Sequence, residues 1–134
     1  MIIKTAPDKE RARSLLKLVN QREEQIASTD VEKFYTIIAE DYYEITKELM
    51  TAISLSDGFK ATGENAHKDL IDYLSSYKEL TKEEVALIDD LRIRRNKLMY
   101  LGVIIEFVYL KNNKDKLLSI ISKLKELLRI RLSK

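Results

Sequence analysis

The chain of 134 residues is long enough for one hydrophobic core and too short for two, so we expect a single domain over residues 1–134. Its composition, 45% hydrophobic and 34% charged with only 3 glycines and 1 proline, favours helices over an all-β or doubly wound fold. The lack of cysteine excludes a disulfide scaffold, a thiol nucleophile and a cysteine-ligated metal site. A formal net charge of +2 gives no global attraction to nucleic acid or anionic lipid, so such binding requires a local patch.

The amino terminus and the hydropathy pattern bear on location. Met1–Pro7 contains an apolar stretch too short for a signal peptide. No run in the chain approaches the roughly 18 apolar residues of a membrane span. We therefore expect a cytoplasmic protein without a membrane partner.

Two long helices are predicted in the first half of the chain. Pro7 suits the first turn of a helix, and a partly apolar stripe continues to Ala27. Thr29–Glu32 has the S/T-x-x-E form of a capping box, in which the hydroxyl and the carboxylate satisfy two backbone donors. Apolar residues at helical spacing follow, which predicts a second helix from about Asp30 to Asp57. A short connection then reaches Gly63.

Three further helices are predicted in the second half. Helical spacing indicates one over Glu64–Tyr77, and Thr81–Glu84 repeats the capping-box pattern at the start of the next, which should end near Gly102. The β-branched and aromatic segment Val103–Leu110 favours a short extended or irregular stretch. An amphipathic pattern from about Asn113 predicts the last helix. The expected fold is all-α, an up-and-down bundle of about five helices.

Arg95 is the chemically unusual residue of this pattern. At about 100° per residue it falls on the same helical face as Ile88, Leu91 and Leu98, the face expected to contact the core. A buried guanidinium is costly unless it is paired or hydrogen-bonded. Either Arg95 pairs with a carboxylate across the bundle or extends its stem to water, or the stripe lines a groove between two subunits where the guanidinium binds a phosphate.

The residues around Arg95 add positive charge. Arg92, Arg94, Arg95 and Lys97 place four cations close together in the sequence. They point around much of the helix, and a solvated face is the alternative explanation for such a cluster. If the cluster binds nucleic acid, we expect Arg92, Arg95 and Lys97 to make the contacts.

The segment Asp90–Tyr100 resembles the signature of HEPN domains, small helical bundles in which an arginine is followed at once by a polar residue, often asparagine, and after four residues in all by a histidine. The order of elements from about Asp30 onward is similar to that of archaeal stand-alone members. The resemblance implies that Arg95 is the catalytic arginine, that Asn96 is its polar neighbour, and that Tyr100 stands where active members have histidine. It also implies a homodimer whose motif helices face each other across a cleft. Active members cleave RNA without a metal, with the ribose 2′-hydroxyl as nucleophile.

Tyr100 lowers the expectation of catalysis. Histidine accepts and donates a proton near neutral pH, whereas tyrosine, with an ordinary pKa of about 10, is a poor base. Loss of one acid–base group typically costs about 10²–10⁴-fold in rate. We therefore expect a dimeric RNA- or nucleotide-binding module with weak or no ribonuclease activity. In it, Tyr100 donates a hydrogen bond to a phosphate, stacks on a base, or packs at the helix end with its hydroxyl in water.

Two other functions stay open. One is an active metal-independent endoribonuclease, the toxin of a pair with a nucleotidyltransferase, and the other is a structural bundle for protein interaction. The chain has no phosphate-binding glycine loop and no serine-nucleophile motif, so other hydrolase chemistry is set aside, and no cofactor or metal is expected. Glu64-x-x-His67 is a single copy of a spacing that di-iron bundles use twice, so capping or packing is the favoured role of His67. A compensating role for His67 beside Arg95 stays open, although the sequence gives it no support. Core or interface packing is expected for four tyrosines, Tyr42, Tyr43, Tyr73 and Tyr77.

Overall fold

The computed structural model describes residues 1–134 and consists of five helices and two short strands. The prediction of an all-α bundle of about five helices is confirmed. No helix combines the length and the hydropathy that a membrane crossing requires. In chain order the elements are β1 (Ile2–Lys4), α1 (Lys9–Ala27), α2 (Tyr35–Ser56), β2 (Phe59–Ala61), α3 (Ala66–Leu74), α4 (Lys82–Leu101) and α5 (Phe107–Leu132).

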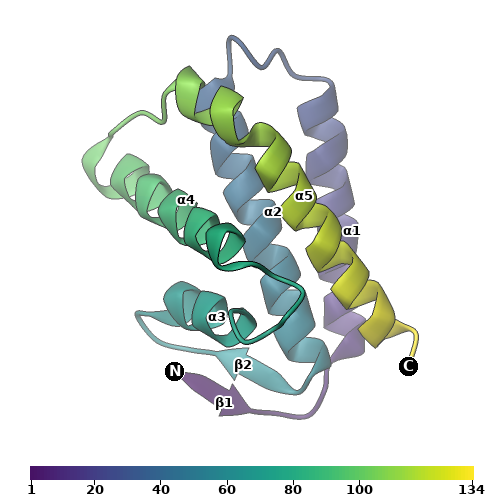
Figure 1. Cartoon of the computed structure of the whole chain (residues 1–134). Helices are drawn as coiled ribbons and strands as arrows, with labels where there is room; N and C mark the ends of the chain where they lie inside the picture. Colours follow the sequence, from purple (N-terminus) through teal and green to yellow (C-terminus); the bar gives the residue numbers. More distant parts are fainter.

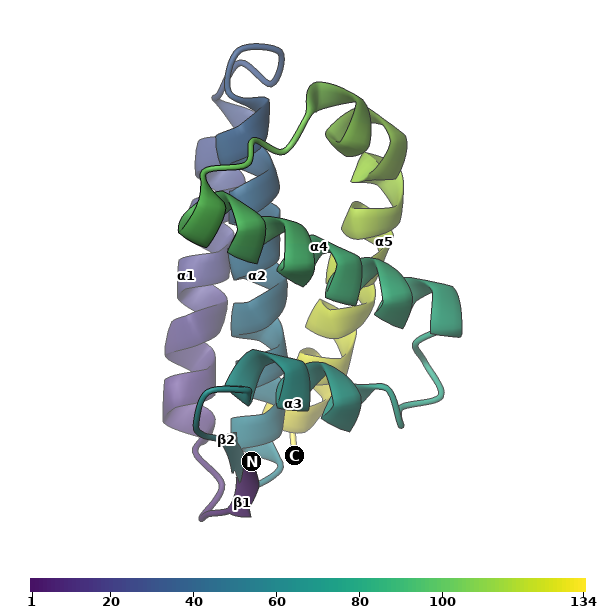
Figure 2. The same ribbon diagram turned by 90° about the vertical axis from the view of Figure 1, so that its left-hand side faces the viewer.

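Helices α1, α2 and α5 run alongside one another, with α2 in contact with both α1 and α5 (Figure 1), and α3 and α4 lie across them (Figure 2). Within this bundle α1 and α2 run in opposite directions, as an up-and-down order requires, whereas α5 runs in the same direction as α2 (Figure 1). The chain reaches that orientation because α4 crosses the bundle and returns the backbone to the end where α2 begins. The crossing leaves one long face of α4 uncovered.

α2 is the central element of the core and contacts all four other helices. Tyr43, Leu49 and Ile53 on it are fully buried, within a cluster of 25 buried residues. Burying one such large apolar side chain stabilises the fold by about 1.5–3 kcal/mol. A helix packed on several sides is a rigid support, so the polar groups that α2 presents to α3 and α4 have fixed positions.

The first two helices begin later than predicted. Pro7 precedes the helix rather than occupying its first turn, and Asp8 caps α1 by accepting a hydrogen bond from the Arg11 backbone N–H at 3.0 Å. The predicted capping box at Thr29 does not form, because the Thr29 hydroxyl donates to the Gln25 carbonyl at the end of α1, at 2.7 Å. α2 therefore begins at Tyr35, without a side-chain cap, and not near Asp30.

The predicted connection after α2 contains a strand that the sequence pattern does not show. β2 pairs with β1 in antiparallel register, with Ile3 opposite Lys60. Gly58 makes the turn into β2 with φ 83°, and a Cβ there would lie 2.9 Å from the Thr5 carbonyl oxygen. The paired strands lead directly into the Gly63 turn and α3, so they anchor the start of that helix.

α3 is shorter than the predicted helix over Glu64–Tyr77 and ends at Leu74. Ser75 and Ser76 donate hydroxyl hydrogen bonds to the carbonyls of Asp72 and Tyr73, which offers the backbone an alternative to continuing the helix.

The tyrosines pack as expected. Tyr42 and Tyr43 are buried, and the Tyr73 and Tyr77 rings pack at 5.8 Å between centroids. Tyr73 and Tyr77 both donate hydrogen bonds to Asp57.

Both ends of α4 confirm the prediction. Thr81 and Glu84 form the reciprocal capping box, with bonds of 2.9 and 3.1 Å, and Gly102 ends the helix in the left-handed region at φ 66°. The irregular stretch after Gly102 is shorter than predicted: it stops at Glu106, and Phe107–Leu110 is already the first turn of α5.

Candidate functional site

Arg95 projects from α4 toward α2, and its side chain is 15% exposed. Its Nη2 donates to the Glu44 carboxylate at 3.1 Å, and its guanidinium lies 5.3 Å from the centre of the Tyr43 ring. Its Nε is buried without a hydrogen-bond partner. Arg95 thus has the carboxylate partner across the bundle that one sequence-based explanation required, but its hydrogen-bonding capacity is only partly used.

Arg95 also lines a surface pocket of about 300 Å³. One wall is the Gly63 turn and the start of α3, and the other is the C-terminal half of α4. The pocket brings together Arg95, Asn96, Tyr100 and Arg92, four of the five predicted site residues. Its remaining lining residues are Gly63, Glu64, Asn65, Ala66, His67 and Lys68.

His67, the one histidine of the chain, belongs to this pocket, a placement that sequence reasoning did not establish. Its Nδ1 lies 2.9 Å from the hydroxyl of Tyr43. Burial lowers the pKa of His67, and the positive charges of Lys47 and Arg95 lower it further. Burial raises the pKa of Tyr43 to about 12, so its hydroxyl stays protonated at neutral pH. His67 is therefore a neutral, oriented imidazole in a basic surrounding.

The cations at the pocket have acidic partners. Arg92 Nε donates to Asp89 at 2.9 Å, and Lys68 Nζ lies 3.7 Å from the same carboxylate. Glu44 lies between Lys47, at 2.7 Å, and Arg95. Burial alone would raise the pKa of Glu44, but the hydrogen bond from Lys47 and the charges of Lys47 and Arg95 lower it, so the carboxylate is ionised. These carboxylates fix the cations in place, and an anionic ligand has to share the cations with the carboxylates.

The start of α3 adds free backbone donors to the same wall. Asn65 precedes the helix without making a side-chain cap, and the N–H groups of His67 and Lys68 have no hydrogen-bond acceptor. Free N–H groups and the positive end of a helix dipole favour a bound anion.

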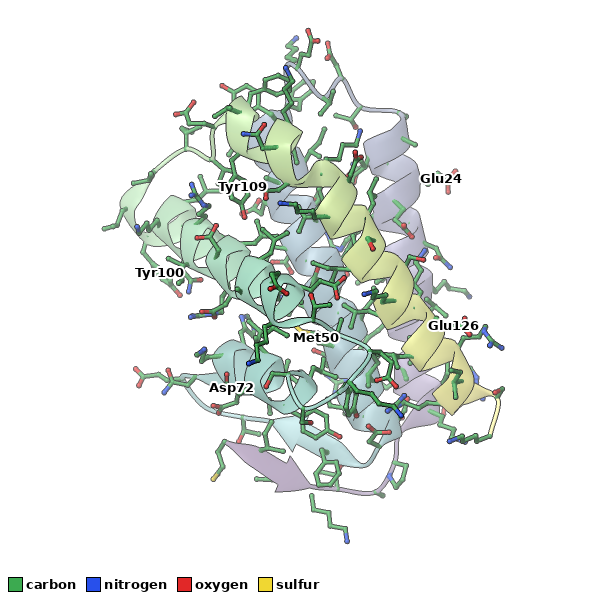
Figure 3. The ribbon with its side chains drawn as sticks, viewed as in Figure 1. Glu24, Met50, Asp72, Tyr100, Tyr109 and Glu126 are labelled. Atoms are coloured by element: carbon green, nitrogen blue, oxygen red, sulfur yellow. The ribbon has the colours of Figure 1, made fainter.

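Lys97 and Tyr100 are more exposed than the other predicted site residues. Lys97 is exposed and lines a separate hollow with Arg94 and the segment after α4, away from Arg95. Tyr100 lines the pocket but is 77% exposed, near the outer end of α4 (Figure 3). Its ring is therefore available to a ligand or to a second protein surface.

No metal site is present among the side chains. No group of three histidine, cysteine, aspartate or glutamate residues could hold an ion. Glu64 lies in the turn before α3, so it does not share a helical face with His67.

Comparison of the chain with family models, curated proteins and solved structures gives no match. The site is therefore interpreted from its own geometry. Sequence reasoning located Arg95, Asn96, Tyr100 and Arg92, and considered His67 beside Arg95 without support for it. It missed the α2 residues Tyr43 and Glu44, for which no local signal exists.

Proposed function

We propose that this protein is a homodimeric, HEPN-like module that binds RNA through its phosphate groups. The observation that supports the proposal most is the pocket in which Arg95 and Arg92 on α4 face the uncapped start of α3. Guanidinium groups and free backbone N–H groups are the donors that proteins use most for phosphate oxygens.

Arg95 is suited to bind a phosphate because most of its hydrogen-bond donors have no protein partner. A guanidinium has five N–H donors, and Arg95 makes one protein hydrogen bond, to Glu44. Glu44 keeps Lys47 as a second partner at 2.7 Å, so the carboxylate stays paired when Arg95 turns toward a phosphate.

The outer face of α4 supports the homodimer. Ala86, Ile93 and Tyr100 are exposed at intervals of seven residues, which places them along one stripe of the helix. An antiparallel pairing of two α4 helices about Ile93 would set Ala86 against Tyr100 and Asp89 against Lys97 of the other copy, apolar against apolar and acid against base. Further exposed apolar residues flank the stripe at its C-terminal end: Met99, Leu101, Val103 and Ile104.

RNA binding is tested by fluorescence anisotropy with labelled single-stranded and hairpin RNAs. We expect affinity that falls steeply as salt rises, because phosphate contacts release counterions. Arg92→Ala should weaken binding at least about tenfold, because one charge-assisted hydrogen bond contributes about 1.5–3 kcal/mol. Arg129→Ala is the matched control, since Arg129 is an exposed cation paired with Glu126 far along α5. Lack of affinity for every RNA at low salt would refute the proposal.

The dimer is tested separately by sedimentation equilibrium. Ile93→Asp places two like charges at the centre of the proposed pairing and should yield a monomer, with little effect on the fold because Ile93 is 40% exposed. A wild-type protein that is monomeric at high micromolar concentration would contradict the pairing.

The alternative of a purely structural bundle is favoured by one observation, the pairing of Arg95 with Glu44. In that case Arg95 variants would unfold the protein, and RNA would not bind.

A further inference from the structure

We infer that the protein has a second anion site, which binds a small phosphomonoester with an apolar group in a hollow that α4 does not reach. This second hollow measures about 310 Å³ and lies between α1, α2, β2 and α3. Pockets for small molecules measure about 300–1,000 Å³, so the hollow suits a small ligand. The inference goes beyond the proposed function and does not rest on it.

The outer part of the second hollow is basic, and its three cations come from three different elements. Arg11 lies on α1, Lys47 on α2 and Lys60 on β2. Arg11 and Lys60 are exposed and take part in no ion pair. Lys47 pairs with Glu44 at 2.7 Å, which occupies one of its three N–H donors. A hollow lined mainly by charges of one sign concentrates their field and attracts an anion.

The one carboxylate in the lining does not cancel this positive charge. Glu48 is buried and accepts two hydrogen bonds from Arg22, at 2.8 and 3.0 Å. Such a bidentate pair leaves little free charge on the carboxylate. Arg11 and Lys60, the two cations without partners, therefore match a phosphomonoester, whose charge at pH 7 is about −1.5 to −2.

The second hollow also has an apolar part. Five of its twelve lining residues are hydrophobic: Leu15, Leu55, Ala61, Ala66 and Leu70. Thr51 and Ser54 lie on the α2 wall, but their hydroxyls already donate to backbone carbonyls of α2, at 2.8 and 2.9 Å. They add no donor for an anion, so the phosphate binds at the cations and an apolar group contacts the hydrophobic residues.

His67 adds a neutral donor on the wall that the second hollow shares with the Arg95 pocket. The buried Tyr43 hydroxyl lies 2.9 Å from Nδ1 of His67 and has no other acceptor. It therefore donates to Nδ1, which leaves the imidazole hydrogen on Nε2. Burial lowers the pKa of His67, and the charges of Lys47 and Arg95 lower it further, so the ring is uncharged at neutral pH. Since the chain has one histidine, the imidazole signals in NMR spectra report on ligands at this wall.

The experiment measures the binding of phenyl phosphate at pH 7 by isothermal titration calorimetry and by the NMR signals of the His67 imidazole. We expect a millimolar or tighter Kd and the same Kd from both measurements. Three comparison ligands separate the contributions of charge and ring: inorganic phosphate lacks the ring, phenol lacks the charge, and benzoate carries a single charge. Each should bind at least about tenfold more weakly than phenyl phosphate.

Variants of the two unpaired cations test the position of the ligand. Lys60→Gln and Arg11→Gln should each weaken the binding of phenyl phosphate at least about tenfold, because each removes a charge-assisted hydrogen bond. Both side chains are exposed and unpaired, so the fold does not depend on them. Lys4→Gln on β1 and Arg13→Gln on α1 are the matched controls, because both residues are exposed and lie outside the hollow. These controls should bind within about twofold of wild type.

Three results would overturn the inference. The first is a lack of phenyl phosphate binding, and the second is inorganic phosphate or benzoate that binds as tightly as phenyl phosphate. The third is an affinity that falls in Arg95→Met and not in Lys60→Gln, which would place the ligand in the Arg95 pocket. All three leave the RNA-binding proposal intact, because RNA affinity is measured separately. Likewise, a protein that binds phenyl phosphate as described and binds no RNA would refute only the proposed function.

Discussion

Arg95→Met separates a functional from a structural role for the unusual arginine of α4. Methionine keeps an unbranched stem of similar length and carries no charge. The substitution removes one charge-assisted hydrogen bond to Glu44, about 1.5–3 kcal/mol, and one cation–π contact with Tyr43, about 0.5–1 kcal/mol. Glu44 is not left unpaired, because Lys47 stays at 2.7 Å.

The same substitution also removes an unfavourable contribution to the stability of the fold. The buried Nε of Arg95 has no hydrogen-bond partner, and such a group costs about 1–3 kcal/mol. A methionine thioether in its place buries apolar surface, so replacing a paired arginine in this way is often neutral. The lost interactions and the removed desolvation penalty nearly cancel, so we expect the free energy of unfolding to change by no more than about 1 kcal/mol.

Urea unfolding followed by circular dichroism at 222 nm measures this change, since the chain has no tryptophan for fluorescence. In thermal melts a change of 1 kcal/mol corresponds to a Tm shift of about 3–5 °C. RNA affinity, in contrast, should fall at least about tenfold, because the phosphate loses a guanidinium. A loss of more than about 3 kcal/mol of stability would show that Arg95 is primarily structural. Unchanged stability together with unchanged RNA affinity would show that Arg95 is not part of the RNA-binding site.

Two further predictions concern the fold. Thr81→Ala breaks the capping box of α4 and should lower the free energy of unfolding, measured in urea, by about 1 kcal/mol. Thr29→Ala removes no cap and should lower that free energy by less. Equal losses of stability would contradict the assignment of the caps. The pKa of Glu84 lies below its ordinary value of 4.5 even though burial opposes the shift, because Lys123 and Thr81 hydrogen-bond to its carboxylate. Its stabilisation is therefore complete above pH 4.5 and is lost as the pH falls through the lower pKa of the folded state. Urea midpoints measured from pH 6 down to pH 3 should show a smaller decline for Glu84→Gln than for wild type, and parallel declines would refute the linkage.

The elements that the sequence predicts correctly are those whose ends depend on adjacent residues. Thr81 and Gly102 bound α4 through contacts within one turn, so their patterns are sufficient. The same capping pattern at Thr29 is misleading, because α1 ends just before it and the Gln25 carbonyl takes the hydroxyl. β1 and β2 have three residues each, too few to show a period, and they pair across more than 50 residues of chain.

The site shows the same limit. Helical spacing identifies Arg95 as a charge on a core-facing stripe, but its partner Glu44 is 51 residues away in the sequence. His67 and Tyr43 are 24 residues apart, and their contact depends on how α3 lies across α2. Contacts of this kind follow from the packing of helices, which no local pattern encodes. Sequence reasoning therefore identified the α4 wall of the pocket and could not decide whether His67 lies on the other.

The attachment of α3 has a mechanical consequence. At its C-terminal end, Tyr73 and Tyr77 donate to Asp57, which also accepts from Arg131 at 2.8 Å. At its pocket end, His67 hydrogen-bonds to Tyr43 of α2, and Asp69 pairs with the amino group of Met1 at the start of β1. Between the two ends, Leu70, Ile71 and Leu74 are buried. The short helix is thus tied at both ends and along its length, so the wall of the pocket that carries His67 cannot move without disturbing the core.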